Sequence, residues 1–332
     1  MAARRLKVAG VGGVPATGAT SVVLNVTVTG TTKPGHVPNT AESNHASQVN
    51  FAAGQTTSNL VVVPVVNGTV DLMASTAGTV DLVADVAGYY AQDTGGAGFR
   101  PLTPTRFTDT RSGLGVPRAK VGSGSTARLQ VTGVKGVPAS GVSAVVMNVT
   151  ATNASHSMVI TAYPDGTPRP GTSNLNVPAG QTVARLVVVP VVNGHIALTN
   201  NYGSVDLVGD VVVYYTDGDS DAFTGIEARG LMDTRSGYGV RAGTVGRGQS
   251  VTLQAAGAGP VPAKISAVVL NVTATGPTTT GYVTVHPSGT PRGTTSSLNK
   301  VTFYNHAGNV HLIADVGLVR VTRRRGGTSG TT

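Results

Sequence analysis

The feature that most constrains this chain is an internal repeat. A Val-Val-Leu/Met-Asn-Val-Thr segment occurs three times, and its asparagines are Asn25, Asn148 and Asn271. Both intervals are 123 residues (148 − 25 and 271 − 148). Solenoid rungs and propeller blades run about 20–50 residues, so this period is too long for either and has the size of a domain. The sequence therefore predicts a row of three similar domains.

Within each copy the pattern is typical of β-structure. Residues 22–29 are rich in Val and Thr and predict a strand, as do 145–152 and 268–275. Residues 183–192 are apolar at nearly every position, which suits a strand buried on both faces. An Asn-Gly pair follows this run at Asn193-Gly194 and again at Asn67-Gly68, and Asn-Gly is a strong hairpin signal.

Two prolines and a closing strand complete the pattern. Pro64 and Pro190 stand inside the apolar strand, which predicts an edge position or a bulge because proline cannot donate to the ladder. Closing strands are expected at 80–86, 205–215 and 310–316. No segment has a convincing 3.6-residue period with caps. We therefore expect an all-β fold of three tandem β-sandwich or jelly-roll-like domains.

Two of the copies are incomplete. The first begins near Leu6 and lacks the opening segment that precedes the matching Leu129. The third is shorter, because Asn271 and Asp315 are 44 residues apart whereas Asn148 and Asp210 are 62 apart (315 − 271 and 210 − 148). We infer that the third copy lacks the apolar strand and its Asn-Gly turn, which leaves an open sheet edge.

These breaks set the predicted domain boundaries. They place the first, N-terminally truncated repeat at 1–95, the complete second repeat at 96–219, the third repeat at 220–319 and a disordered basic Gly/Thr tail at 320–332. We expect the open reading frame to be a fragment that has lost an upstream part and its signal peptide. A family member with variable termini would explain the same ends.

Composition narrows the partners. The net charge is +9, with 24 basic and 15 acidic residues, but seven basic residues stand in the two ends, so the body carries only 17 − 15 = +2. A nucleic-acid interface needs basic residues gathered on a folded face, so we expect no specific nucleic-acid partner. The chain has no Cys, which removes disulfides and thiolate metal sites. It has no apolar stretch long enough for a membrane helix.

Catalytic motifs are missing from the sequence. It contains no Gly-x-Ser-x-Gly elbow, no His-Glu-x-x-His and no phosphate-binding glycine loop. The seven His residues stand mostly at unmatched positions of the repeat, so they form no repeated triad or metal constellation. We therefore expect that the protein is not an enzyme.

Three sets of residues recur or could bind a ligand. An Asp-Thr-Arg motif could bind a sugar or an acidic group, although Asp and Arg in a turn more often bond to each other and hold the opening segment against the sandwich. Aspartates four apart on the closing strand could supply oxygens to Ca²⁺, and a structural polar network is the alternative we favour. Two tyrosines, expected at matching positions, could stack on a glycan. The candidate residues are Asp109, Arg111, Asp233 and Arg235 for the first set, Asp81, Asp85, Asp206 and Asp210 for the second, and Tyr163 and Tyr282 for the third.

The repeat resembles one found in secreted and cell-surface proteins of actinomycete-type bacteria. The resemblance rests on residues 102–111 with Asp-Thr-Arg, 145–152, 163–170, 173–176, 180–182, 187–193 and the Asp-Val pair at 210–211 with the tyrosines at 214–215. It implies accessory β-rich modules in an extracellular setting, with no catalytic residues and no cofactor to carry over. The function expected is a spacer or adhesion module. Its expected partner is a cell-surface polymer, such as a glycan, or a protein. The alternatives are a carbohydrate- or cell-wall-binding protein and a structural component of a virion or sheath.

Overall fold

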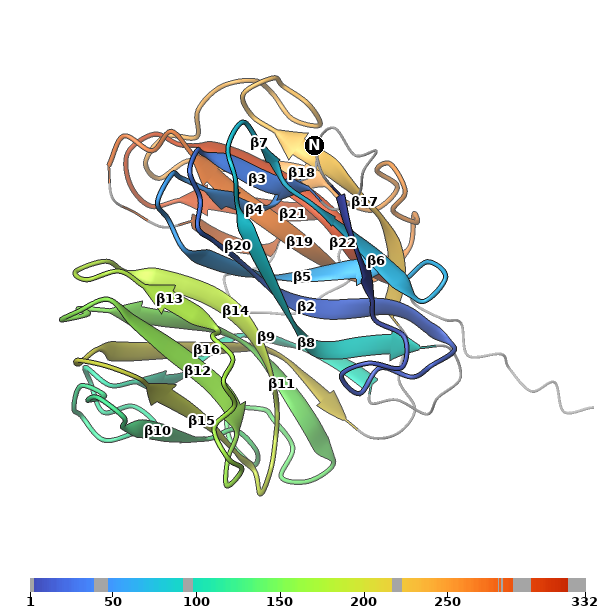
Figure 1. Cartoon of the computed structure of the whole chain (residues 1–332). Helices are drawn as coiled ribbons and strands as arrows, with labels where there is room; N and C mark the ends of the chain where they lie inside the picture. Colours follow the sequence, from blue (N-terminus) through green and yellow to red (C-terminus); the bar gives the residue numbers. More distant parts are fainter. Residues whose placement is uncertain are drawn as a thin grey trace, which may run out of the picture.

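The computed structural model describes residues 3–38, 47–91, 98–216, 223–279, 281, 283–288 and 300–321, and every regular element among them is a β-strand. The all-β prediction is therefore confirmed. Among these residues, strands pair only with strands of the same repeat. Two sheets enclose a hydrophobic core in the second and in the third repeat, and three sheets do so in the first (Figure 1). The fold is of the β-sandwich, jelly-roll-like type.

The second repeat is the most complete. Its first sheet has the order β14-β11-β16-β9 and its second the order β10-β15-β12-β13. All pairings are antiparallel. The strands are β9 (Gly98–Asp109), β10 (Thr126–Gln130), β11 (Val142–Thr152), β12 (Met158–Pro164), β13 (Leu175–Val177), β14 (Val183–Pro190), β15 (His195–Asn200) and β16 (Asp206–Thr216).

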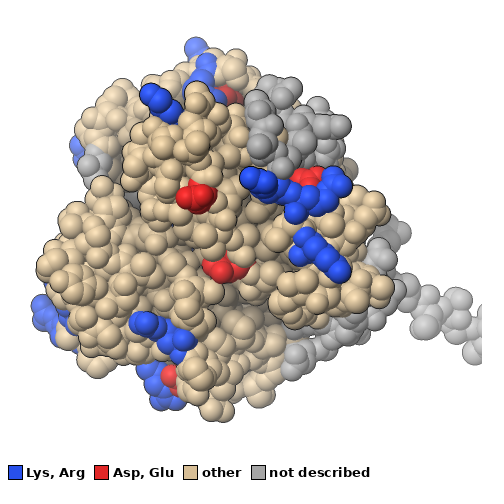
Figure 2. Space-filling view, viewed as in Figure 1, with Lys and Arg blue, Asp and Glu red and all other residues tan. Residues whose placement is uncertain are grey.

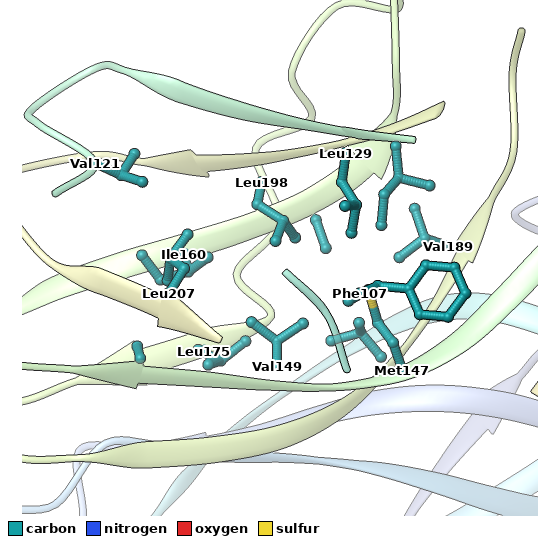
Figure 3. Packing of buried hydrophobic residues seen from close by; sticks show 14 of the residues in the cluster. Phe107, Val121, Leu129, Met147, Val149, Ile160, Leu175, Val189, Leu198 and Leu207 are labelled. Atoms are coloured by element: carbon teal, nitrogen blue, oxygen red, sulfur yellow. The ribbon is translucent and has the colours of Figure 1, made fainter. Parts of the chain in front are cut away.

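A hydrophobic core fills the space between these two sheets. Phe107, Met147, Ile160, Leu198 and Leu207 are each at most 2% exposed and lie in one cluster (Figure 3). Alternate residues of each strand point inward, as the pleat requires. Comparable but separate clusters lie in the first repeat and in the third. Each repeat thus builds its own core from aliphatic residues, in keeping with the scarcity of aromatic residues.

In the described residues of the first repeat, the sheet that contains β2 has three strands, whereas the matching sheet of the second repeat has four. Its sheets are β5-β2-β8, β4-β3-β7 and the pair β1-β6. Because the described residues include no counterpart of β9, one edge of β8 has no strand beside it. The strands are β1 (Ala3–Lys7), β2 (Ala19–Thr29), β3 (Gly35–Pro38), β4 (Ser47–Phe51), β5 (Thr57–Pro64), β6 (Thr69–Met73), β7 (Ser75–Thr76) and β8 (Asp81–Ala91).

The third repeat is reduced at the opposite edge. Its sheets are β17-β22-β19 and β18-β21-β20, and in the described residues β19 pairs only with β22, whereas the matching β11 pairs on both sides. This agrees with the predicted loss of a strand. The strands are β17 (Phe223–Asp233), β18 (Ser250–Gln254), β19 (Ile265–Thr275), β20 (Val283–Pro287), β21 (Lys300–Asn305) and β22 (His311–Val321).

The local turn and edge predictions hold. Asn67 and Asn193 have φ of 50° and 49°, and the glycines after them also have positive φ, as the hairpin turn requires. Pro64 and Pro190 lie on β5 and β14, which are end strands of their sheets. Both prolines therefore stand where a missing N–H leaves no gap in the ladder between two strands.

The three repeats lie against one another, and the first contacts both of the others (Figure 1). The outer face of the first sheet carries some apolar residues, and in this arrangement the neighbouring repeats cover them. Val146 of β11, Val62 of β5 and Val269 of β19 meet in one shared cluster. A row would leave part of this apolar surface in water. The domain boundaries predicted from the sequence stay predictions.

Candidate functional site at the junction of the repeats

The Asp-Thr-Arg motif closes on itself. Arg111 donates from Nε to Asp109 Oδ1 at 2.9 Å and from Nη2 to Asp109 Oδ2 at 2.7 Å, and its backbone N–H also reaches Oδ1. Asp233 and Arg235 repeat the arrangement, with Nη2 to Oδ2 at 2.7 Å. This is the bidentate pairing that suits a guanidinium and a carboxylate. Both carboxylates are therefore occupied by the arginine two residues later.

These bonds act on the protonation of the two aspartates. The hydrogen bonds from Arg111 hold the pKa of the Asp109 carboxyl below its ordinary value, and Arg235 has the same effect on the pKa of Asp233. A carboxylate that accepts several N–H bonds resists protonation. The turn that follows, which we call the hook (residues 109–115 and 233–239), is thus organised around an ionised aspartate.

The central threonine of the motif fastens the hook to the closing strand. Thr110 donates from Oγ1 to Asp206 Oδ1 at 3.1 Å and accepts the Leu207 N–H at 3.0 Å. In the third repeat Thr234 pairs with His311 Nδ1 and accepts the Leu312 N–H. His311 thus takes the place of Asp206. The recurring motif has a structural explanation in both copies.

The four aspartates considered as calcium ligands lie in different surroundings. Asp206 also accepts a bond from Asn153, and Asp210 forms a bidentate pair with Arg106 at 2.8 and 3.1 Å. Asp81 is exposed, and Asp85 is half-buried. Among the residues that the structure describes, no three His, Cys, Asp or Glu side chains are close enough to hold a metal ion.

Asp85 and Asp210 are matching residues with different surroundings. Arg106 lies on β9, which has no counterpart among the described residues of the first repeat, so Asp85 has no such partner there. Burial raises the pKa of the Asp85 carboxyl, although a hydrogen bond from Asn25 opposes this rise. The two matching aspartates thus stand in different electrostatic environments.

The tyrosine prediction needs a correction. Tyr163 is half-buried, and its hydroxyl lies 3.0 Å from Thr199 Oγ1. Tyr163 pairs with Ala197, and at the matching place of the third repeat His286 pairs with Thr302. His286, which precedes a proline as Tyr163 does, is therefore its counterpart, and Tyr282 is not. Tyr282 itself lies outside the described residues.

The junction between the first two repeats contains a pair of matching tyrosines. Tyr90 near the end of β8 and Tyr215 near the end of β16 have their hydroxyl oxygens 2.9 Å apart. Burial raises the pKa of both phenols. Phe99 packs edge-on against Tyr215 with ring centroids 5.8 Å apart. These tyrosines pack where two repeats meet.

Polar bonds cross the same junction. Arg185 on β14 donates from Nε to the carbonyl of Ser58 and from Nη2 to Thr57 Oγ1 at 2.8 Å, both on β5. In the other direction Asn25 donates to the Ser173 carbonyl at 2.6 Å. Between the first and third repeats, Asn50 donates to Thr273 Oγ1 at 3.3 Å. These bonds fix the orientation of the repeats around the shared apolar cluster.

A cavity opens at the place where all three repeats meet. Its volume is about 290 Å³, and we call it the junction cavity. It is lined by residues 49–50 and 57–59 of the first repeat, 184–186 of the second and 272–274 of the third. The third-repeat wall belongs to β19, which pairs only with β22 in the described part of the chain.

Sequence reasoning did not find Arg185. The residue does not recur, because the matching position of the first repeat is Asn59, and a search for repeated chemistry passes over it. The available signal was a single charged residue inside the apolar run 183–190. A charge in such a run needs a polar partner, and here the partners come from another repeat.

Figure 2 shows one face of the molecule, where Lys, Arg, Asp and Glu stand singly or in small groups over a largely uncharged surface. Among the described residues no helix is long and apolar enough to cross a membrane.

No family model matches the chain, and no curated protein matches it. Solved structures of viral proteins match the chain at low identity and with low TM-scores. A triple jelly-roll protein of an archaeal virus is 10% identical, with 96% of this chain and 82% of that chain covered and a TM-score of 0.21. A protein of Sulfolobus turreted icosahedral virus is 10% identical over 97% and 84%, with a TM-score of 0.22. A mutant VP2 protein of infectious bursal disease virus is 11% identical over 95% and 67%, with a TM-score of 0.19. These likenesses concern the fold alone.

Proposed function

We propose that this chain is a non-catalytic modular protein that is secreted or displayed at the cell surface, where it acts as a spacer and adhesion module. The observation that carries the proposal is the use of the recurring polar residues. Asp109, Arg111, Asp206 and Asp210 bond to neighbours within their own repeat, and so do Asp233 and Arg235. Side chains bonded in this way stabilise a scaffold and are not held ready for a substrate.

The packing of the repeats supports a rigid module. The shared apolar cluster and the bonds from Arg185 and Asn25 join the repeats into one body. A body of this kind holds its binding surfaces at fixed distances, as a spacer or an adhesion module requires. The partner in this proposal is a cell-surface polymer or another surface protein.

The test combines retention and turnover. The full chain is incubated with isolated cell walls of actinomycete-type bacteria and sedimented, and the supernatant is assayed for released reducing ends, amines and carboxylates. We expect the protein to be retained on the wall while these products stay at the level of a no-protein control. Product release that grows with protein concentration and time would contradict a non-catalytic role.

Carbohydrate binding is the second candidate function. It is favoured by the junction cavity, whose walls combine a guanidinium with hydroxyl and amide side chains. A glycan array separates the candidates, since a dedicated carbohydrate-binding protein gives defined micromolar binding to one glycan class. Tyr163→Ala tests whether the half-buried ring on β12 contributes to such binding.

A further inference from the structure

The junction cavity contains a positive charge that no carboxylate of the described residues neutralises. Arg185 lines the cavity, and no Asp or Glu among the described residues forms an ion pair with it. Its described partners are the carbonyls of Ser58 and Ala184 and the hydroxyl of Thr57. Arg128 on β10 of the same repeat is different, because it forms an ion pair with Asp165.

The guanidinium keeps donors available. Arginine has five N–H donors in a fixed planar fork, and the bonds to Ser58, Ala184 and Thr57 use three of them. The three neutral partners hold the plane in place and leave its charge uncompensated. A partly desolvated cation that is already oriented attracts an anion more strongly than a mobile surface lysine or arginine does.

The remaining lining suits a small hydroxylated ligand. Thr57, Asn59 and Thr273 add hydroxyl and amide groups from two other strands, and no aromatic side chain is among the lining residues. A volume of about 290 Å³ lies at the lower end of small-molecule sites, which run about 300–1,000 Å³. The cavity therefore accommodates one sugar-sized unit and not a long stacked oligosaccharide.

We propose that the junction cavity binds an acidic sugar unit, with the sugar carboxylate on Arg185 and the sugar hydroxyls on the threonine and asparagine side chains of the wall. This inference rests on the binding role in the proposed function, for which it names the ligand class and the site. A neutral sugar would leave the guanidinium without its counter-charge, and a simple carboxylate would leave the hydroxyl-bearing walls unused.

The test is calorimetric titration of the full chain with sodium glucuronate, glucose and sodium acetate at equal ionic strength. We expect saturable binding of glucuronate with a Kd below about 1 mM and binding at least about tenfold weaker for glucose and acetate. Acetate that binds as tightly as glucuronate would overturn the sugar assignment. The absence of saturable glucuronate binding would overturn the site.

Variants connect the binding to the cavity. Arg185→Gln should weaken glucuronate binding at least about tenfold, whereas Arg128→Gln, on a different sheet of the same repeat and outside the cavity wall, should change it less than about twofold. Equal binding by wild type and Arg185→Gln would overturn the proposal.

Because Arg185 also joins two repeats, its loss could unfold the junction. Arg185→Lys keeps the charge but not the fork, and we expect it to fold with at least about fivefold weaker binding. Unchanged binding by this folded variant would also overturn the proposal. Cell-wall retention is measured with the same proteins, so a failure of glucuronate to bind removes this site without contradicting the proposed function.

Discussion

Gly115 closes the hook of the second repeat by lying directly against the strand before it. Its φ is +71°, and a Cβ added there would stand 2.2 Å from the carbonyl oxygen of Phe107. Gly124 has a similar φ of +68°, but a Cβ at that position meets nothing within 4 Å. The two glycines therefore separate the effect of backbone conformation from the effect of close approach.

The expected stability losses differ accordingly. Gly124→Ala places one L-residue in the left-handed region, which costs about 1–2 kcal/mol. Gly115→Ala carries the same penalty and also forces the hook away from Phe107. The two backbone bonds between Asp109 and Leu114, at 3.0 and 3.1 Å, are then lost, each contributing about 1 kcal/mol. The total for Gly115→Ala is about 3–4 kcal/mol.

The assay is hydrogen exchange followed by mass spectrometry on the full chain, because the protein has no Trp to report unfolding by fluorescence. Gly115→Ala should accelerate exchange in residues 107–115 and in the facing part of β16, whereas Gly124→Ala should not affect the hook. Equal losses for the two variants, or an unperturbed hook in Gly115→Ala, would refute the argument from close approach.

Three further predictions concern charge and sheet edges. The pKa of Asp109 is depressed, so its stabilising contribution is present above the ordinary aspartate pKa of about 3.9 and is lost as pH falls through the folded-state value. The difference in Tm between wild type and Asp109→Asn should therefore shrink on acidification. Asp85→Asn should keep or raise the Tm at pH 7, because burial raises the pKa of that carboxyl. Asp210→Asn should lower the free energy of unfolding by about 1 kcal/mol, because the pairing with Arg106 is lost. Equal effects of the two variants would contradict this contrast. In the third repeat, β19 has no second strand beside it among the described residues, so this repeat should show the fastest amide exchange of the three, and equal protection would refute this.

Local chemistry made much of the fold predictable. The strands, the Asn-Gly turns and the edge positions of Pro64 and Pro190 follow from residue preferences that act over a few positions. The Asp-Thr-Arg bonds follow for the same reason, since Asp109 and Arg111 are two residues apart. Structure of this kind needs no knowledge of distant parts of the chain.

The arrangement of the repeats was not predictable in the same way. An apolar run shows that a strand is buried on both faces, but it does not say which other repeat covers the outer face. The partners of Arg185 come from β5, more than a hundred residues earlier in the chain. The equivalence of Tyr163 with His286 depends on strand register, which cross-strand pairing sets and a deletion obscures.

The contact between Tyr90 and Tyr215 joins the same place of two repeats, because the two tyrosines stand at matching positions of β8 and β16. A substitution at either tyrosine therefore leaves the buried hydroxyl of the other without this bond, so one change in one repeat is felt in both.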